Sequence, residues 1–460
     1  MELISMFKMI FIKNGTIVNE GKSFQSNILI RGDKIVEIGL LKKPSGAYEI
    51  DAKGLLILPG VIDTHVHFRE PGFTNKGNIL SESIAAAAGG ITSFLEMPNT
   101  VPNAITNKIL EEKFIIAKKN SVINYSFYLG IGNNNEYLAI DTTKVAAITD
   151  DGLSYTTTEA LLCNNNEKAD KVLYYTAVLN AGSVVSVHAE DKSLIKRNAE
   201  KYYKKYGDII PFKHHINIRS TQTCFAAAKK MISKARKYNT RLHLLNISSR
   251  IESRLFFNEL PVREKKITAE VCIPYLHFSH IDYPEFGGLI KCDPAIKTFK
   301  DKEALWEALL DDRIDIISTD HAPHTLKEKQ ETYFKCRSGM PMVQHALPLM
   351  LHYVKAGKIS IEKVVEKMCH NPAIIFGISK RGFIKKGFQA DIVLVDMQKK
   401  WVVSKSNILY KCNWSPLEGF EFAAKVVCTL VNGQIVYKDD VIYKELKAAS
   451  ELVLTVNNDF

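Results

Sequence analysis

The chain has 460 residues, of which 46% are hydrophobic and 24% charged, as is ordinary for a globular protein with a large core. No apolar run reaches the roughly 18–20 residues that span a bilayer, and the first twelve residues lack the cleavage site of a secretory signal, so we expect a cytoplasmic protein without a membrane partner. The net charge of +11 is spread along the chain without an RNA-binding signature, so we also expect no nucleic-acid partner. The eight cysteines form no C-x-x-C pair, which predicts reduced thiols.

Both ends of the chain show the pattern of short strands separated by turns. Residues 1–58 contain several such runs, and residues 383–440 contain a strand followed by a hairpin about Asn432-Gly433. Each segment is too small to bury a core by itself. We therefore predict that the two segments pair into a small composite β-sandwich domain, followed by a C-terminal tail, residues 441–460, that shows little pattern.

Between residues 59 and 382, strand-like runs alternate with helical patterns. The eight predicted strands are residues 61–68, 91–99, 123–131, 144–151, 184–191, 241–248, 267–276 and 314–319. The predicted helices are residues 79–88, 107–118, 158–179, 221–237, 302–310, 345–353 and 361–368. This α/β alternation fits a closed (β/α)8 barrel of the TIM type. A doubly wound open sheet is the alternative, but it would gather its chemistry at one switch point rather than at many strand ends.

Polar side chains stand where these apolar runs stop, and the carboxyl ends of barrel strands form the catalytic face. His65 and His67 are two residues apart in the first strand, so they project from the same face and can grip one metal ion. Arg69 follows and places a cation beside that metal. Asn99 and His324 stand in corresponding positions after other strands.

A hydrolytic metal centre needs neutral imidazoles and carboxylates, with room for a water whose pKa the metal lowers. His188 closes the predicted fifth strand, and Asp320 follows the eighth. A carboxylate placed like Asp320 can touch the metal and also move a proton to a leaving nitrogen, which makes Asp320 the first candidate for a catalytic residue. His214 and His215 are expected to decorate a loop.

The chain resembles the dihydroorotases of the amidohydrolase superfamily over nearly its whole length. The segments that carry the resemblance are D-x-H-x-H-F-R-E-P-G at 63–72, M-P-N-T at 97–100, T-D-D-G at 149–152, V-H-A-E-D at 187–191 and T-D-H-A-P-H at 319–324. The first and the last of these are highly specific. The β segments at the two ends are shared more widely across the superfamily, so they support the fold rather than the substrate.

The resemblance implies zinc-dependent, reversible hydrolysis of dihydroorotate to N-carbamoyl-L-aspartate in de novo pyrimidine (UMP) biosynthesis. It implies that His65 and His67 hold one zinc ion and that His188 helps to hold a second. Asp320 would be a metal ligand and proton shuttle. The substrate carboxylate would be bound by Arg69, Asn99 and His324, because a guanidinium fork suits a carboxylate. Whether the protein forms a homo-oligomer or assembles with a carbamoyltransferase stays open.

A ligand that bridges two metals has two candidates. Relatives with T-D-D-G use the second aspartate, which is Asp151 here, whereas others use a carboxylated lysine, which Lys144 could supply. We favour Asp151, because it needs no modification and stands at the end of its predicted strand. A lysine at a strand entrance is more often a solvated charge.

Two positions depart from the pattern of the family. Asn246 stands where relatives carry a histidine for the second metal, and an amide oxygen is a poorer zinc ligand than imidazole. Asp293 replaces an expected asparagine and adds a negative charge near an anionic substrate; we entertain the hypothesis that it approaches the second metal. These departures keep open a catalytically impaired homologue that serves as a scaffold. A hydantoinase or allantoinase is the other alternative, although a hydantoin ring lacks the carboxylate that Arg69 would bind.

Overall fold

The computed structural model describes residues 8–130, 144–150, 173, 183–445 and 447–455. Parallel strands at all eight predicted positions form a TIM barrel, which confirms the predicted fold class. These strands are β6 (Val61–Val66), β7 (Ile91–Glu96), β8 (Asn124–Phe127) continued by β9 (Leu129–Gly130), β10 (Ile148–Thr149), β11 (Val185–His188), β12 (Leu242–Leu245), β13 (Ile267–Cys272) and β14 (Ile316–Ser318). The barrel closes where the main-chain nitrogen of His67 donates to the carbonyl oxygen of His321 over 2.8 Å.

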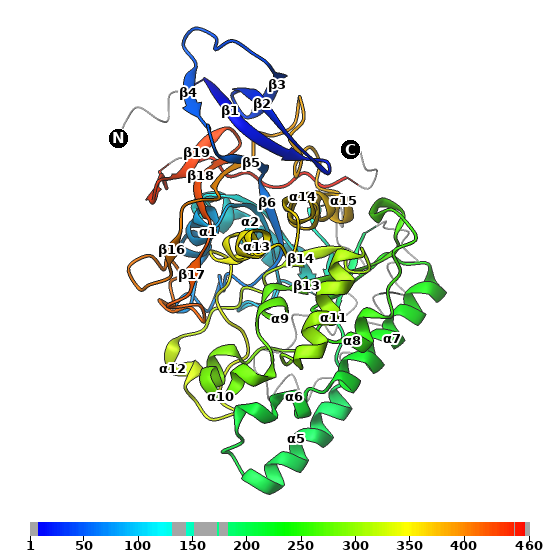
Figure 1. Cartoon of the computed structure of the whole chain (residues 1–460). Coiled ribbons are helices and arrows are strands. Elements are labelled where there is room, and N and C mark those ends of the chain that lie inside the picture. Colours follow the sequence, from blue (N-terminus) through cyan, green and yellow to red (C-terminus); the bar gives the residue numbers. More distant parts are fainter. Residues whose placement is uncertain (1–7, 131–143, 151–172, 174–182, 446, 456–460) are drawn as a thin grey trace.

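Helices cover the outside of the barrel, as Figure 1 shows. They include α1 (Ile79–Ala88), α2 (Asn107–Asn120), α7 (Thr221–Tyr238), α11 (Phe299–Leu310) and α13 (Ala346–Lys355), each at a predicted position. The side chain of Asn78 caps α1 by accepting from the main-chain nitrogen of Ser81, and α1 ends before Gly90, whose φ of 84° favours glycine. The predicted helix at 158–179 lies outside the described residues.

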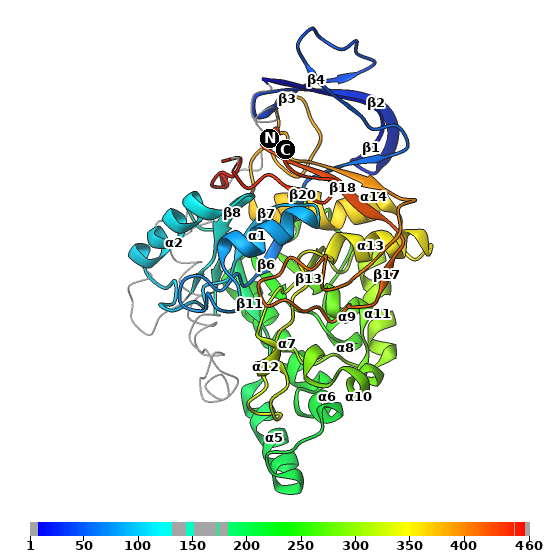
Figure 2. The ribbon, with the colours of Figure 1, turned by 90° about the vertical axis from the view of Figure 1, so that its left-hand side faces the viewer.

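Several helices were predicted incompletely or not at all. The predicted helix 361–368 is longer: α14 (Ile361–Val365), a π-helical turn (Glu366–His370) and α15 (Asn371–Phe376) follow one another. The amphipathic α5 (Lys192–Tyr206) was not predicted, and it projects from the end of the molecule opposite the large sheet (Figures 1 and 2). Short helices in the loops are α6 (His215–Ile218), α8 (Arg250–Ser253), α9 (Ile273–His277), α10 (Tyr283–Phe286) and α12 (Leu326–Lys329).

The two ends of the chain meet in one mixed sheet of nine strands, as predicted for the terminal segments. The sheet contains β1 (Met9–Asn19), β2 (Lys22–Arg31), β3 (Lys34–Gly39), β4 (Tyr48–Asp51), β5 (Leu56–Pro59), β15 (Ile392–Asp396), β18 (Lys425–Val431), β19 (Gln434–Lys438) and β20 (Val441–Ile442). The antiparallel pairing of β5 with β15 joins the segments, and Ile57 and Leu394 are buried there. A separate pair comprises β16 (Trp401–Val402) and β17 (Glu421–Phe422). The domain boundaries proposed at residues 58, 383 and 440 stay a prediction.

The described part of the C-terminal tail packs along the barrel. Glu451 forms a bridge with Tyr125, and Leu454 forms one with Ile378. The seven cysteines in the described residues are free thiols. Within the same residues, no helix combines the length and apolarity needed to cross a membrane.

Candidate active site

Three predicted metal ligands converge at the carboxyl ends of β6 and β14. Oδ1 of Asp320 lies 3.5 Å from Nε2 of His65 and 3.2 Å from Nε2 of His67. Both imidazoles are buried, and the side chain of Asp320 is 11% exposed. Asp320 has a φ of 47°, a left-handed conformation that is uncommon for a residue other than glycine and is found at functional sites.

Each imidazole makes a hydrogen bond through Nδ1, on the side of the ring that faces away from Asp320. This bond places the proton of the ring on Nδ1. Nδ1 of His65 donates to Oε1 of Glu270 over 2.6 Å, and Nδ1 of His67 donates to Oδ1 of Asn99 over 2.8 Å. A neutral imidazole carries one proton, so both Nε2 atoms present lone pairs toward the Asp320 carboxylate. Three acceptors that face one another without a proton between them suit a cation, so these residues fit a metal ion.

A second set of possible metal-ligand atoms lies close together on His65, Glu270 and Cys272. Glu270 is fully buried in β13 and also faces Nε2 of His243, 3.4 Å away. Burial raises the pKa of Glu270, but the charges of the His65 and His243 rings when they are protonated, together with their hydrogen bonds to Glu270, outweigh burial and lower the pKa. Glu270 is therefore an orienting carboxylate behind a ligand, a role that sequence reasoning missed. The signal for it is a single acid in the apolar run of β13.

The charge state of Asp320 also suits a metal. Burial raises its pKa, yet the rings of His65 and His67, when they are protonated, outweigh burial and lower the pKa below its usual value; a cation held by the neutral rings would act in the same direction. Asp320 is thus ionised at neutral pH, which is the form that binds metal and accepts a proton.

Arg69 follows the ligand His67 by two residues, and His324 follows Asp320 by four. Arg69, with a φ of 71°, turns away from the end of β6 and donates from Nε to the carbonyl oxygen of Pro323 over 3.1 Å. Its Nη2 lies 3.1 Å from Nε2 of His324. The structure therefore brings together Arg69 and His324, two of the three residues predicted to bind the substrate carboxylate. The third, Asn99, holds His67 through its amide oxygen.

The predicted ligands of a second metal are arranged differently. Among the described residues, the close cluster comprises His65, His67 and Asp320, and His188 lies outside it. His188 ends β11, and its Nε2 lies 3.1 Å from Oε2 of Glu190. Asp151 lies outside the described residues. The alternative bridging residue, Lys144, is described and exposed.

Asn246 presents its amide nitrogen to the site. This Nδ2 donates to Oδ2 of Asp320 over 3.4 Å and to the main-chain oxygen of Asp293 over 3.3 Å. The amide oxygen instead accepts from the thiol of Cys272 over 2.8 Å. Asn246 therefore offers Asp320 a hydrogen-bond donor where relatives are expected to offer a metal ligand.

The hypothesis that Asp293 approaches a second metal is not supported by the position of its carboxylate. Oδ2 of Asp293 pairs with Nη2 of Arg219 over 2.7 Å, and Nη1 of Arg219 pairs with Oε2 of Glu190. Nε2 of His215 lies 3.6 Å from Oδ1 of Asp293. His215 is fully buried rather than in an exposed loop, so that expectation was wrong. Sequence reasoning missed Arg219, whose guanidinium neutralises two carboxylates behind the strand ends.

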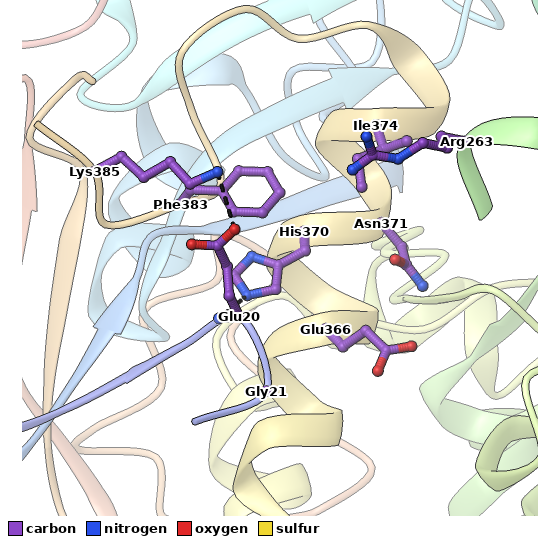
Figure 3. A pocket seen from close by; sticks show the side chains of 9 residues that line it. All are labelled: Glu20, Gly21, Arg263, Glu366, His370, Asn371, Ile374, Phe383 and Lys385. Atoms are coloured by element: carbon purple, nitrogen blue, oxygen red, sulfur yellow. Dashed lines mark hydrogen bonds and ion pairs between the residues drawn. The ribbon is translucent and has the colours of Figure 1, made fainter. Parts of the chain in front are cut away.

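A separate cavity of about 330 Å³ lies at the other end of the barrel (Figure 3). There Glu20 pairs with Lys385 over 2.9 Å, and the ring of His370 stacks on Phe383. Asn371 faces the same cavity and donates to the main-chain oxygen of Asp315, which precedes β14. The cavity therefore lies away from the strand ends that carry the predicted site residues.

Comparisons with known proteins agree with this geometry. The model of the "Amidohydrolase family" matches residues 56–436. The chain belongs to the amidohydrolase family. Among the relatives of this amidohydrolase, a dihydroorotase from Pyrococcus abyssi is 32% identical and covers 96% of each chain. A dihydroorotase from Acetivibrio thermocellus is 33% identical over 94% of this chain and 99% of its own.

Solved structures of related enzymes show the same fold as this amidohydrolase. The L-hydantoinase (dihydropyrimidinase) of Arthrobacter aurescens superimposes with a TM-score of 0.90, covering 97% of this chain and 100% of its own. Its sequence is 24% identical, so this likeness concerns the fold.

Proposed function

We propose that the protein is a dihydroorotase that reversibly hydrolyses dihydroorotate to N-carbamoyl-L-aspartate in pyrimidine biosynthesis. The observation that carries the proposal is the contact between Arg69 and His324, which stand two and four residues after His67 and Asp320 of the ligand cluster. A ring amide that also bears a carboxylate needs both a hydrolytic centre and an anion pocket. The relatives named dihydroorotase support the same substrate.

Each residue then has a defined role. When bound, the metal supplies a water of lowered pKa and polarises the ring carbonyl. His65, His67 and Oδ1 of Asp320 would hold it, and we propose zinc as the ion because imidazole nitrogen and carboxylate oxygen suit zinc. Asp320 accepts the proton of the attacking water at Oδ2 and passes it to the ring nitrogen as the carbon–nitrogen bond breaks. Arg69, Asn99 and His324 orient the substrate by its carboxylate.

The described residues support one firmly held metal ion. Asn246 donates a hydrogen bond to Asp320 in place of a ligand. A second ion, held by His188 and Asp151, stays part of the proposal only as a weaker site. The position of Asn246 also favours a second candidate function, an impaired homologue that acts as a scaffold for a partner enzyme such as a carbamoyltransferase.

An activity assay separates the two candidates. The purified, zinc-loaded chain is assayed for ring opening at alkaline pH and for ring closure near neutral pH, with hydantoin as a comparison substrate. The proposal predicts turnover of dihydroorotate and N-carbamoyl-aspartate and little turnover of hydantoin. Absence of turnover in both directions with zinc bound contradicts the enzyme and favours the scaffold.

The variant Asn246→His refines the test of metal count. Restoring an imidazole is expected to add a second equivalent of bound zinc and to raise activity, because His is the better ligand. The matched control Asn246→Gln keeps an amide and is expected to add no zinc. If Asn246→His binds no more zinc than the unmodified chain, the second site is absent rather than weakened.

A further inference from the structure

Lys76 lies in the loop between β6 and α1 and is held in place on several sides. Its side chain is almost fully buried and passes 5.2 Å from the centre of the Phe73 ring. Nζ pairs with Oε1 of Glu328 over 2.6 Å and lies 3.2 Å from Nδ1 of His324. Sequence reasoning gave this lysine no role.

The ammonium group of Lys76 decides which nitrogen of His324 carries the proton. An ammonium group only donates, so Nδ1 of His324 must accept. Burial lowers the pKa of His324 well below its usual value, and the charges of Arg69 and Lys76 lower it further. His324 is therefore neutral, and its one proton lies on Nε2, which donates it to the main-chain oxygen of Ser338 over 3.0 Å.

In this tautomer, the contact between Arg69 and His324 is not a hydrogen bond. Nη2 of Arg69 lies 3.1 Å from Nε2 of His324, and in this tautomer both nitrogens are donors. Two adjacent N–H groups cannot hydrogen-bond to each other, but they can share an acceptor that carries negative charge. A carboxylate oxygen can accept from Arg69 and share the Nε2–H of His324 in a three-centre bond with the main-chain oxygen of Ser338.

Lys76 also ties together the two segments that carry this pair. Arg69 and Lys76 belong to the loop after β6, whereas His324 and Glu328 belong to the segment after β14. Glu328 is fixed by Thr325, whose main-chain nitrogen and hydroxyl donate to Oε2 over 3.0 and 2.9 Å. Nε1 of Trp414 donates to the main-chain oxygen of His324 over 2.7 Å. Both the ring and the backbone of His324 are therefore held.

We propose that Lys76 is a positioning and specificity residue for the carboxylate of the substrate. It holds His324 in the Nε2–H tautomer and adds a fixed positive charge behind the Arg69–His324 pair. The inference rests on the proposed function, because it concerns how the same site selects an anionic ring. It explains selection of a carboxylated cyclic amide over a neutral one without assigning Lys76 any part in bond cleavage.

Kinetics of Lys76→Met and Lys76→Gln test the proposal. In Lys76→Met, KM for dihydroorotate is expected to rise about tenfold or more, because a charge-assisted interaction is lost. KM for dihydrouracil, which lacks the carboxylate, and the zinc content are expected to stay unchanged. Lys76→Gln keeps a donor to Nδ1, so its KM for dihydroorotate should lie between those of Lys76→Met and the unmodified chain.

The control Lys358→Met removes a lysine that also pairs with a glutamate and lies over an aromatic ring, and should change neither KM. Equal rises in KM for both substrates, or no rise, would overturn the proposal.

A measurement without turnover keeps the two proposals separate. In the full-length protein labelled with nitrogen-15 histidine, the signals of His324, assigned with His324→Gln, are expected to show an unprotonated Nδ1 and a protonated Nε2. Lys76→Met should shift this population toward Nδ1–H. A protonated Nδ1 in the unmodified chain would contradict the role of Lys76. An unmodified chain that is inactive on dihydroorotate contradicts the proposed function, while the nitrogen signals still decide the tautomer.

Discussion

Oε1 of Glu270 lies 2.6 Å from Nδ1 of His65, and both side chains are shielded from solvent inside the barrel. This bond leaves Nε2 of His65 as a lone pair directed at Asp320. An imidazole held in this way is a better metal ligand, because its tautomer and ring orientation are fixed before the metal arrives.

The variant Glu270→Gln is therefore expected to bind zinc about 10–100-fold more weakly, since a neutral amide oxygen is a poorer acceptor than a carboxylate. Competition with a chromogenic chelator measures the change in zinc affinity. Glu252→Gln alters another fully buried carboxylate, outside the ligand cluster, and should leave zinc affinity unchanged. Equal zinc affinity in Glu270→Gln and the unmodified chain would show that the bond does not tune the ligand.

Arg219 is expected to contribute strongly to the free energy of unfolding through its ion pairs with Glu190 and Asp293. Its guanidinium pairs with both Glu190 and Asp293, so Arg219→Met leaves two carboxylates without their cation. Removing one partner from such a buried network lowers the free energy of unfolding by about 3–5 kcal/mol. Urea denaturation measures the loss.

The matched control for Arg219→Met is Lys400→Met, which breaks an ion pair whose side chains are 62% and 56% exposed. Exposed pairs contribute only about 0–1 kcal/mol. A loss in Arg219→Met no larger than the loss in Lys400→Met would contradict the structural role of the buried arginine.

The buried carboxyl group of Glu252 is expected to make the free energy of unfolding fall as the pH rises. Burial raises its pKa from 4.5 to about 7, against the opposing hydrogen bonds from Ser249 and Ser248 and the charge of Lys297. The folded state therefore binds the proton more tightly than the unfolded state. This contribution to stability is fully present below about pH 4.5 and is lost as the pH rises through about 7.

The size of that contribution is about 3 kcal/mol. Urea denaturation at pH 5 and at pH 7.5 should therefore show a smaller decline in the free energy of unfolding for Glu252→Gln than for the unmodified chain. Glu259→Gln removes an exposed carboxyl group and should follow the unmodified chain. Identical declines in all three proteins would show that the pKa of Glu252 is not raised.

Much of the fold follows from local patterns in the sequence. The alternating runs around β6 and β14 predict strands, and their polar ends predict the meeting of His65, His67 and Asp320. These predictions succeed because strand periodicity and the common face of a parallel barrel are local rules. The length of the helix that begins at Ile361 was not predicted, because tertiary packing decides where such a helix ends.

The residues that hold the site in place were harder to predict. Lys76 and Arg219 act through partners 248 residues and 74 residues away in the chain, His324 and Asp293. No spacing rule connects such positions. Glu270 is an exception in principle, because an acid in a buried strand needs a partner, and that requirement alone points to an imidazole or a cation.

Zinc binding by ligand variants tests the metal centre most directly. The unmodified chain, dialysed against buffered zinc, should retain at least one equivalent, while His65→Ala, His67→Ala and Asp320→Ala should each lose the firmly held ion. Thermal unfolding checks that each variant is folded, and metal analysis by mass spectrometry counts the zinc. Folded variants that retain as much zinc as the unmodified chain would contradict a metal centre built from these three residues.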